Sequence, residues 1–151
     1  MESPMSDVRS IALDEMEIGL SAEAVRTVTE EDLDMFAKVS GDYNPVHMDE
    51  EFARATPFRG RIAHGALVAS YISGVLGNQL PGPGAIFLGL NMRFFHPTRI
   101  GDEVRTRVEV KSVDLKSRKA VMDCTCYVGD KLTMQAEAEV MVRKRHRKAG
   151  D

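Results

Sequence analysis

The chain has 151 residues, of which 43% are hydrophobic and 28% charged, and its net charge is −3 at pH 7. These values are typical of one globular domain. No apolar run approaches the ~20 residues that span a bilayer, so we expect no membrane partner. The acidic balance gives no reason to expect nucleic acid.

The N-terminal residues are polar and acidic, without the basic start and apolar stretch of a signal peptide, so we expect a cytoplasmic protein. Cys124 and Cys126 lie two residues apart. On a strand they would share one face, which makes a disulfide between them awkward, and no second pair of ligands suggests zinc. We expect two reduced thiols.

Three segments are expected along the chain. Residues 1–12 form a flexible N-terminal segment, residues 13–143 the folded domain and residues 144–151 a basic C-terminal tail. The basic run RKRHRK begins just before this boundary, at Arg143. A solvated tail is the default for such a run, and contact with an acidic carrier is the alternative.

The first half of the domain predicts one strand and two helices before its most apolar stretch. Residues 24–28 alternate like a strand. Thr29, with Asp32 three residues later, predicts a capped helix that ends near Gly41. A second short helix is expected from Asp49 to about residue 56.

Residues 64–79, HGALVASYISGVLGNQ, contain no charge and predict a helix that is buried nearly all round. The glycines inside it each cost roughly 1 kcal/mol relative to alanine. We expect close approach of another backbone as compensation.

The remainder predicts antiparallel strands at 85–95, 102–114, 119–128 and 131–142, with hairpin turns at 116–118 and 129–130. Alternation places Ile86, Leu88, Leu90, Met92 and Phe94 on one face of the first, and Val104, Thr106, Val108, Val110 and Ser112 on one face of the second. The fold class is therefore α+β, a sheet wrapped around the long helix. Because such a sheet leaves open edges, we expect a homodimer.

Asp42 and His47 lie five residues apart in a turn shaped by Gly41 and Pro45. A carboxylate and an imidazole at that spacing could reach one water, as general acid–base hydration requires. The alternative is that Asp42 and Asn44 merely bond backbone amides of the turn.

His64 and Gly65 open the long helix, where free N–H groups and the positive end of the helix dipole point outward. Such an N–H could stabilise a thioester oxygen that gains negative charge. Alternatively, Gly65 only permits tight packing and His64 only caps the helix. His96, before Pro97 at a strand end, reads as a surface or turn residue.

The segment SGDYNPVHMDEEFARATPFRGRIAHGALVASYISGVLG resembles the hydratase-2 signature of the MaoC-like dehydratase family, and the likeness continues through LPGPGAIFLGLNMRFFHPTRIGDEV. It covers about residues 25–142 and is closest to the short (R)-specific enoyl-CoA hydratases. The resemblance implies a hot-dog fold, a dimer or higher oligomer, and no metal or cofactor.

The resemblance implies roles by position. Asp42 and His47 match the catalytic pair that holds the water, and Gly65 matches the residue whose backbone N–H polarises the thioester carbonyl. Ser73, with Leu76 near it, matches the acyl-binding part of the site. Asn44 and His64 match further motif positions, Asn44 as a turn residue and His64 in a structural role. One departure is Arg59-Gly60-Arg61, which replaces the usual proline-containing approach to His-Gly.

The hypothesis is reversible syn hydration of trans-2-enoyl-CoA to (R)-3-hydroxyacyl-CoA, in fatty acid or polyhydroxyalkanoate metabolism. Two alternatives on the same fold are a 3-hydroxyacyl-acyl-carrier-protein dehydratase and an acyl-CoA thioesterase. The third is a non-catalytic protein that binds acyl thioesters.

Overall fold

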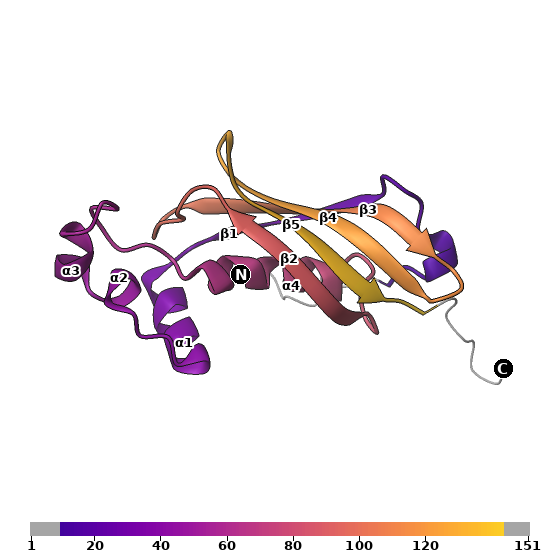
Figure 1. Cartoon of the computed structure of the whole chain (residues 1–151), viewed down its shortest axis with the longest axis horizontal. Helices are drawn as coiled ribbons and strands as arrows, with labels where there is room; N and C mark the ends of the chain where they lie inside the picture. The colour runs from indigo at the N-terminus through magenta and orange to yellow at the C-terminus, as the bar shows by residue number, and fades with distance from the viewer. Residues whose placement is uncertain (1–9, 144–151) are drawn as a thin grey trace.

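A five-stranded antiparallel sheet curves around one long helix in the computed structural model, which describes residues 10–143 (Figure 1). The strand order is β1-β3-β4-β5-β2. The strands are β1 (Ser21–Thr27), β2 (Ile86–Phe94), β3 (Glu103–Asp114), β4 (Lys119–Val128) and β5 (Lys131–Met141). The helices are the 3-10 turn η2 (Leu13–Glu15), α1 (Glu30–Ser40), α2 (Pro45–Met48), α3 (Glu50–Arg54) and α4 (Gly65–Asn78).

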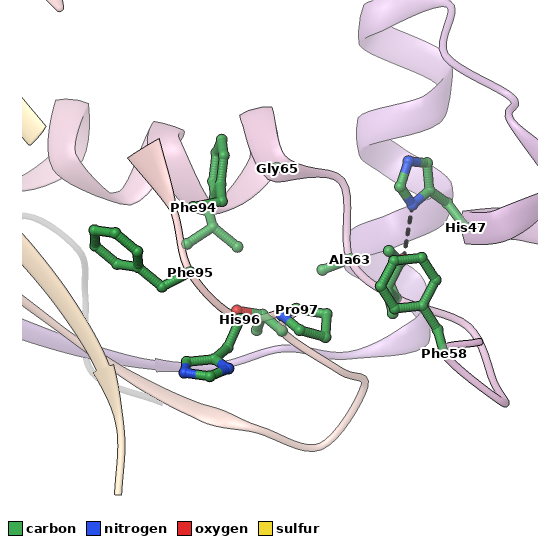
Figure 2. A pocket seen from close by; sticks show the side chains of 11 residues that line it. His47, Phe58, Ala63, Gly65, Phe94, Phe95, His96 and Pro97 are labelled. Carbon is green, nitrogen blue, oxygen red and sulfur yellow. Dashed lines mark hydrogen bonds between the residues drawn. The ribbon is translucent and has the colours of Figure 1, made fainter. Parts of the chain in front are cut away.

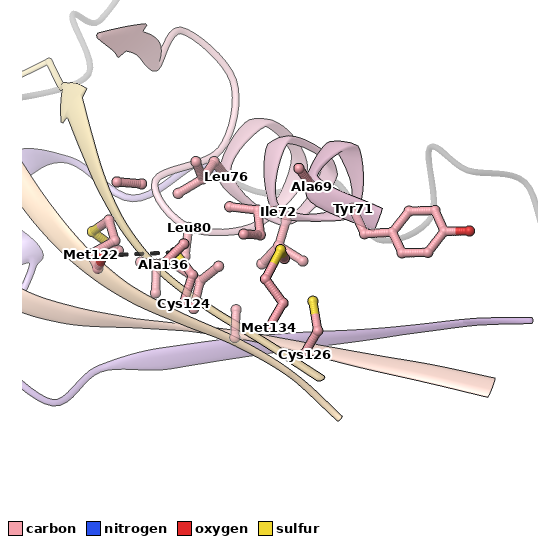
Figure 3. Packing of buried hydrophobic residues seen from close by; sticks show 14 of the residues in the cluster. Ala69, Tyr71, Ile72, Leu76, Leu80, Met122, Cys124, Cys126, Met134 and Ala136 are labelled. Carbon is pink, nitrogen blue, oxygen red and sulfur yellow. Dashed lines mark hydrogen bonds between the residues drawn. The ribbon is translucent and has the colours of Figure 1, made fainter. Parts of the chain in front are cut away.

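The long helix α4 packs one face on the concave side of the sheet. Ile72 and Val75 are fully buried there, in one cluster with Met122 and Met134 of the central strands (Figure 3). Burying each such side chain contributes roughly 1.5–3 kcal/mol. This cluster fixes where the first turn of α4 lies, and therefore where its free N–H groups point.

The opposite face of α4 is open, so the prediction of a helix buried nearly all round is wrong. Its small residues are exposed, namely Ala66, Ser70, Ser73, Gly74 and Gly77. A Cβ at Gly74 or Gly77 would meet no atom of residues 10–143 within 4 Å. The backbone predicted to approach these glycines is therefore absent from the described part of the chain, because one sheet covers only one side of the helix.

Cys124 and Cys126 lie on the same face of β4, as predicted, and both are buried and free. Burial raises the pKa of Cys124 to about 12. The thiol is thus protonated at neutral pH and behaves as a small apolar side chain in the core.

The alternation expected for β2 is interrupted by a shift in pairing between Phe87 and Gly89. Leu90, Met92 and Phe94 lie opposite core-facing residues of β5, as predicted, but Ile86 lies on the other face. A bulge adds one residue to a strand, so every side chain beyond it changes face.

The same correction applies to β3, whose pairing with β4 shifts between Val110 and Ser112. Val110 is buried, whereas Ser112 is exposed and Val113 replaces it opposite the core residue Ala120. Alternation read along one strand cannot detect such a bulge, because the partner strand determines it.

The N-terminal boundary differs from the expected one. Residues 10–12, assigned above to a flexible segment, are held at the cis Leu80-Pro81 turn, where Ile11 N–H donates to Pro81 O (2.8 Å). Ala12 is buried. Residues 1–9 and the basic tail 144–151 lie outside the described residues.

The helices between β1 and α4 begin at side-chain caps and end at backbone caps. The predicted capping box is confirmed: Thr29 Oγ1 accepts from Asp32 N–H, and Asp32 accepts from Thr29 N–H. Asp49 caps α3 as predicted. The single turn of α2 was not predicted.

None of the helices within residues 10–143 is long and apolar enough to cross a membrane.

Candidate active site

The turn after α1 presents the Asp42 carboxylate to solvent. Gly41 ends α1 with a φ of 78°, a left-handed conformation that glycine adopts without strain. Asp42 N–H then donates to Ser40 Oγ (3.1 Å), and Asp42 Oδ1 accepts from Asn44 N–H (3.1 Å). The turn-forming role considered for Asp42 is therefore real, but it occupies only one carboxylate oxygen.

Asn44 starts the helical turn that carries His47. Its Oδ1 accepts from Val46 N–H (3.1 Å), and Pro45 occupies the first helical position. Proline is favoured there because its missing N–H would have no partner. Asn44 itself is exposed and does not line the cavity described below.

His47 is 9% exposed, and its orientation is fixed by a backbone carbonyl. Its Nδ1 lies 2.8 Å from Ile62 O, which can only accept, so Nδ1 carries the proton (dashed line, Figure 2). In the neutral ring Nε2 then holds a free lone pair. This is the tautomer needed to accept a proton from water.

His64 contacts both predicted catalytic residues, Asp42 and His47. It is 1% exposed, and its Nε2–H donates to Asp42 O (2.9 Å). Its ring centroid lies 4.1 Å from that of His47 and 4.9 Å from that of Phe36. Burial lowers the pKa of His64, which favours the neutral ring. Within residues 10–143, its Nδ1 has no hydrogen-bond partner.

Asp42, His47 and His64 thus come together from two loops and one short helix. Ligand-type atoms of the three lie within 4.8 Å of one another. Such a set resembles a transition-metal site, where each imidazole donates its other ring N–H to an acceptor, as His47 Nδ1–H and His64 Nε2–H do here to carbonyl oxygens. The groups that remain open are the Asp42 carboxylate, His47 Nε2 and the buried His64 Nδ1, and the first two are hydrogen-bond acceptors suited to one water.

Gly65 is the first residue of α4, so its N–H has no intrahelical partner. A Cβ at this position would lie 2.9 Å from the Phe94 ring. Glycine therefore allows the Phe94 ring to pack closely here, as the packing interpretation predicted. The role of the Gly65 N–H toward a thioester oxygen stays a prediction.

An apolar cavity of about 290 Å³ lies between His47 and Gly65 (Figure 2). Its wall is made of Phe58, Ile62, Ala63, Val68, Phe94, Phe95, His96, Pro97 and Thr98. His96 is exposed, as expected for a surface residue, but it also lines this cavity. An apolar cleft with few polar groups is typical of a small-molecule site.

Ser73 and Leu76 do not line this cavity. Ser73 is exposed on the open face of α4 and Leu76 is buried. Ser73 lies eight residues beyond Gly65, about 12 Å along a helix. Within one chain, the two predicted acyl-binding residues are therefore separate from the catalytic cluster.

Two groups of this site carry no signal in the sequence. Ile62 orients His47 through its carbonyl oxygen, which every residue type has. Arg61, noted above only as a departure, donates through Nε–H to His47 O. Phe94 had a detectable signal, since it belongs to the predicted apolar strand.

Residues 14–131 match the family described as MaoC like domain. The chain is 41% identical over 141 residues to a 3-hydroxybutyryl-CoA dehydratase of Methylorubrum extorquens, covering 93% of this chain and 90% of that protein. It is 43% identical over 127 residues to an (R)-specific enoyl-CoA hydratase of Rhodospirillum rubrum, covering 84% and 88% of the two chains.

Among solved structures, an R-hydratase of Pseudomonas aeruginosa in the unliganded form superposes with a TM-score of 0.85 at 37% identity. The match covers 95% of both chains. Together with the wrapped sheet described above, these comparisons confirm the predicted hot-dog fold and α+β class.

Proposed function

Because this chain belongs to the MaoC-like domain family, we propose that it is an (R)-specific enoyl-CoA hydratase. The reaction is reversible syn addition of water to a trans-2-enoyl-CoA, giving the (R)-3-hydroxyacyl-CoA. The observation that carries the proposal is the pairing of the Asp42 carboxylate with a free His47 Nε2 beside the Gly65 N–H.

In this proposal Asp42 and His47 hold the attacking water. Each offers an acceptor, so the water donates both of its O–H groups and directs a lone pair at the β-carbon. The oxygen–carbon bond forms as the double bond opens, one water proton passes to the pair, and a proton is returned to the α-carbon. Because the pair acts from one side of the substrate, both additions occur on the same face.

The Gly65 N–H binds the thioester carbonyl oxygen, which gains negative charge when water attacks. It acts with the positive end of α4 in a mostly apolar cavity, where such a donor is worth ~3–4 kcal/mol. The groups that bind the water and stabilise the developing negative charge are thus oriented before the substrate binds. The step adds water without net oxidation, so it needs no redox cofactor.

We propose that Ser73, exposed on the open face of α4, binds substrate in a homodimer, whereas Leu76 lies in the apolar core of its own chain. Strand β2 is an edge of the sheet, and it exposes Ile86, Phe87, Leu88, Met92 and Phe94. The other edge strand, β1, exposes one large hydrophobic residue, Val25, between the charged side chains of Glu23 and Arg26. Pairing through β2 would bring a partner beside the open face of α4, with pantetheine entering between the subunits. Light scattering on the purified protein tests the dimer.

The test of the activity uses crotonyl-CoA. The protein should lower the ultraviolet absorbance of the conjugated double bond to its equilibrium value, without release of free thiol, and the product should resist an (S)-specific 3-hydroxyacyl-CoA dehydrogenase. Thiol release would instead indicate a thioesterase, and binding without turnover a non-catalytic acyl-thioester protein.

The variant His47→Asn sharpens this test. Its amide can keep the bond to Ile62 O but offers no Nε2 lone pair, so the rate should fall ~10²–10⁴-fold. The matched control Asp130→Asn lies in the exposed β4–β5 turn and should behave as wild type. Wild-type turnover in His47→Asn would refute the assignment.

Relatives named 3-hydroxyacyl-[acyl-carrier-protein] dehydratase also match this chain, one from Arabidopsis thaliana at 35% identity over 89 residues. The alternative carrier is therefore tested with the same acyl group on both carriers. A higher kcat/KM with the protein-borne substrate would favour the dehydratase. The pathway and the cytoplasmic location stay predictions.

A further inference from the structure

Arg61 is a nearly buried cation in the loop before α4, and it joins two helices. Its side chain is 8% exposed. Nε–H donates to His47 O (2.5 Å), and Nη1–H donates to the Glu30 carboxylate (2.8 Å). Nη2 also lies 4.0 Å from the carboxylate of Asp34, one turn further along α1. One guanidinium thus connects α1 to the main chain of the residue that carries the imidazole.

The next residue, Ile62, also bonds to α2. Ile62 N–H donates to Val46 O (3.2 Å), and Ile62 O accepts from His47 Nδ1–H (2.8 Å). Arg61 and Ile62 therefore hold the main chain of α2 at two successive carbonyls, and the His47 ring as well. Because α2 is a single turn, it has no stability of its own, and these contacts decide where its side chains point.

A buried guanidinium contributes little net stability, because its desolvation offsets most of what its ion pairs contribute. Its planar fork can, however, bond several acceptors in a fixed geometry, which an aliphatic side chain or a lysine cannot. Here the Nε–H of Arg61 donates one of these bonds to the carbonyl oxygen of His47.

We propose that Arg61 is a positioning residue, an inference that rests on the proposed function. Arg61 fixes the His47 imidazole through the main chain of α2 and so sets the rate of the hydration step. It touches neither water nor substrate. Its loss displaces the ring by a fraction of the reacting distance, so kcat falls while KM changes little.

The first experiment compares Arg61→Met and Arg61→Lys with wild type on crotonyl-CoA. Arg61→Met should lower kcat on the order of 10²-fold, the usual effect of a ~1 Å misplacement. Arg61→Lys keeps the charge but cannot reach Glu30 and His47 O together, so its kcat should be intermediate. The matched control Arg54→Met removes an exposed arginine of α3 that, among residues 10–143, pairs only with Glu50, and it should keep wild-type kinetics.

Chemical rescue separates positioning from a general structural role. Guanidinium ion, well below denaturing concentration, should restore part of kcat in Arg61→Ala, whereas urea, of similar shape but uncharged, should not. Wild-type kcat in Arg61→Met, or a loss matched by an equal loss of folded protein, would overturn the proposal.

Nitrogen NMR of the His47 ring keeps this test independent of the activity. If wild type hydrates no enoyl thioester, the proposed function fails. The positioning claim still requires the tautomer or the Nδ1 shift of His47 to change in Arg61→Met and Arg61→Lys. Unchanged His47 signals there would contradict it.

Discussion

Two regions of the molecule are held together by different forces. The sheet and α4 enclose an apolar cluster with side chains such as Ile72 and Met122 at 0% exposure. The connecting segment, residues 28–64, contributes few side chains to that cluster, and its helices are held by caps, histidine bonds and the Arg61 ion pairs. Burial of apolar side chains on a hydrogen-bonded sheet therefore makes the scaffold, and directional bonds of side chains orient the reacting groups.

The comparison predicts that the two regions fail differently when mutated. A cavity in the core should lower the free energy of unfolding, whereas changes to the reacting groups of the connecting segment or at its junction with α4 should mainly lower kcat. The following predictions are arranged from the largest expected effect to the smallest.

Ile72→Ala should have the largest effect on stability. It removes three carbons of a fully buried side chain from the face of α4 that meets the sheet, and such changes cost about 2–5 kcal/mol. Urea unfolding measures the loss, and kcat per folded molecule should stay close to that of wild type. Asn78→Ala, at the exposed end of the same helix, is the control. Full stability in Ile72→Ala would refute the account of the core.

Gly65→Ala should lower kcat about 10–100-fold with little loss of stability, because the new Cβ would lie 2.9 Å from the Phe94 ring beside the N–H donor. Steady-state kinetics measure the effect. The double variant Gly65→Ala, Phe94→Leu removes the ring and should recover part of the rate. No recovery would mean that the alanine acts on the backbone and not through Phe94.

Thr29→Ala should destabilise the protein by about 1 kcal/mol, since it removes one half of the capping box at the start of α1. Thr29→Ser keeps the hydroxyl and should restore most of the stability. Urea midpoints compare the three proteins. Equal midpoints for the alanine and serine variants would show that the cap does not stabilise α1.

His64 should give the folded protein a pH dependence. Its folded-state pKa is lowered by burial, so the unfolded chain binds the proton more readily. The contribution is fully present above the ordinary value of 6.5 and is lost as the pH falls through the lowered folded-state pKa. Urea midpoints should therefore drop more between about pH 7.5 and pH 5.5 in wild type than in His64→Gln. Identical slopes would contradict this.

Local patterns in the sequence were sufficient for features that short-range chemistry determines. Thr29 with Asp32 predicted the start of α1, and the uncharged stretch at 64–79 predicted α4. The glycine of Gly129-Asp130 correctly marked the β4–β5 hairpin. Asp42 and His47 were found through their residue types and the motif around them, and the structure brings them together.

Features that depend on distant partners could not be predicted. The bulge at Phe87–Gly89 exists only in the pairing with β5, so alternation misplaced Ile86. The bond between His47 and Ile62 uses a carbonyl that every residue has. The open face of α4 was missed because apolar composition does not tell which side the sheet covers.

The central claim is that the connecting segment carries the chemistry and the core carries the stability. Asp42→Asn tests it most directly, because the amide keeps the acceptor for Asn44 N–H but loses the charge. We predict that kcat on crotonyl-CoA falls ~10²–10⁴-fold while the urea midpoint stays at the wild-type value. An unchanged kcat, or a loss accompanied by a matching fall in the midpoint, would contradict the claim.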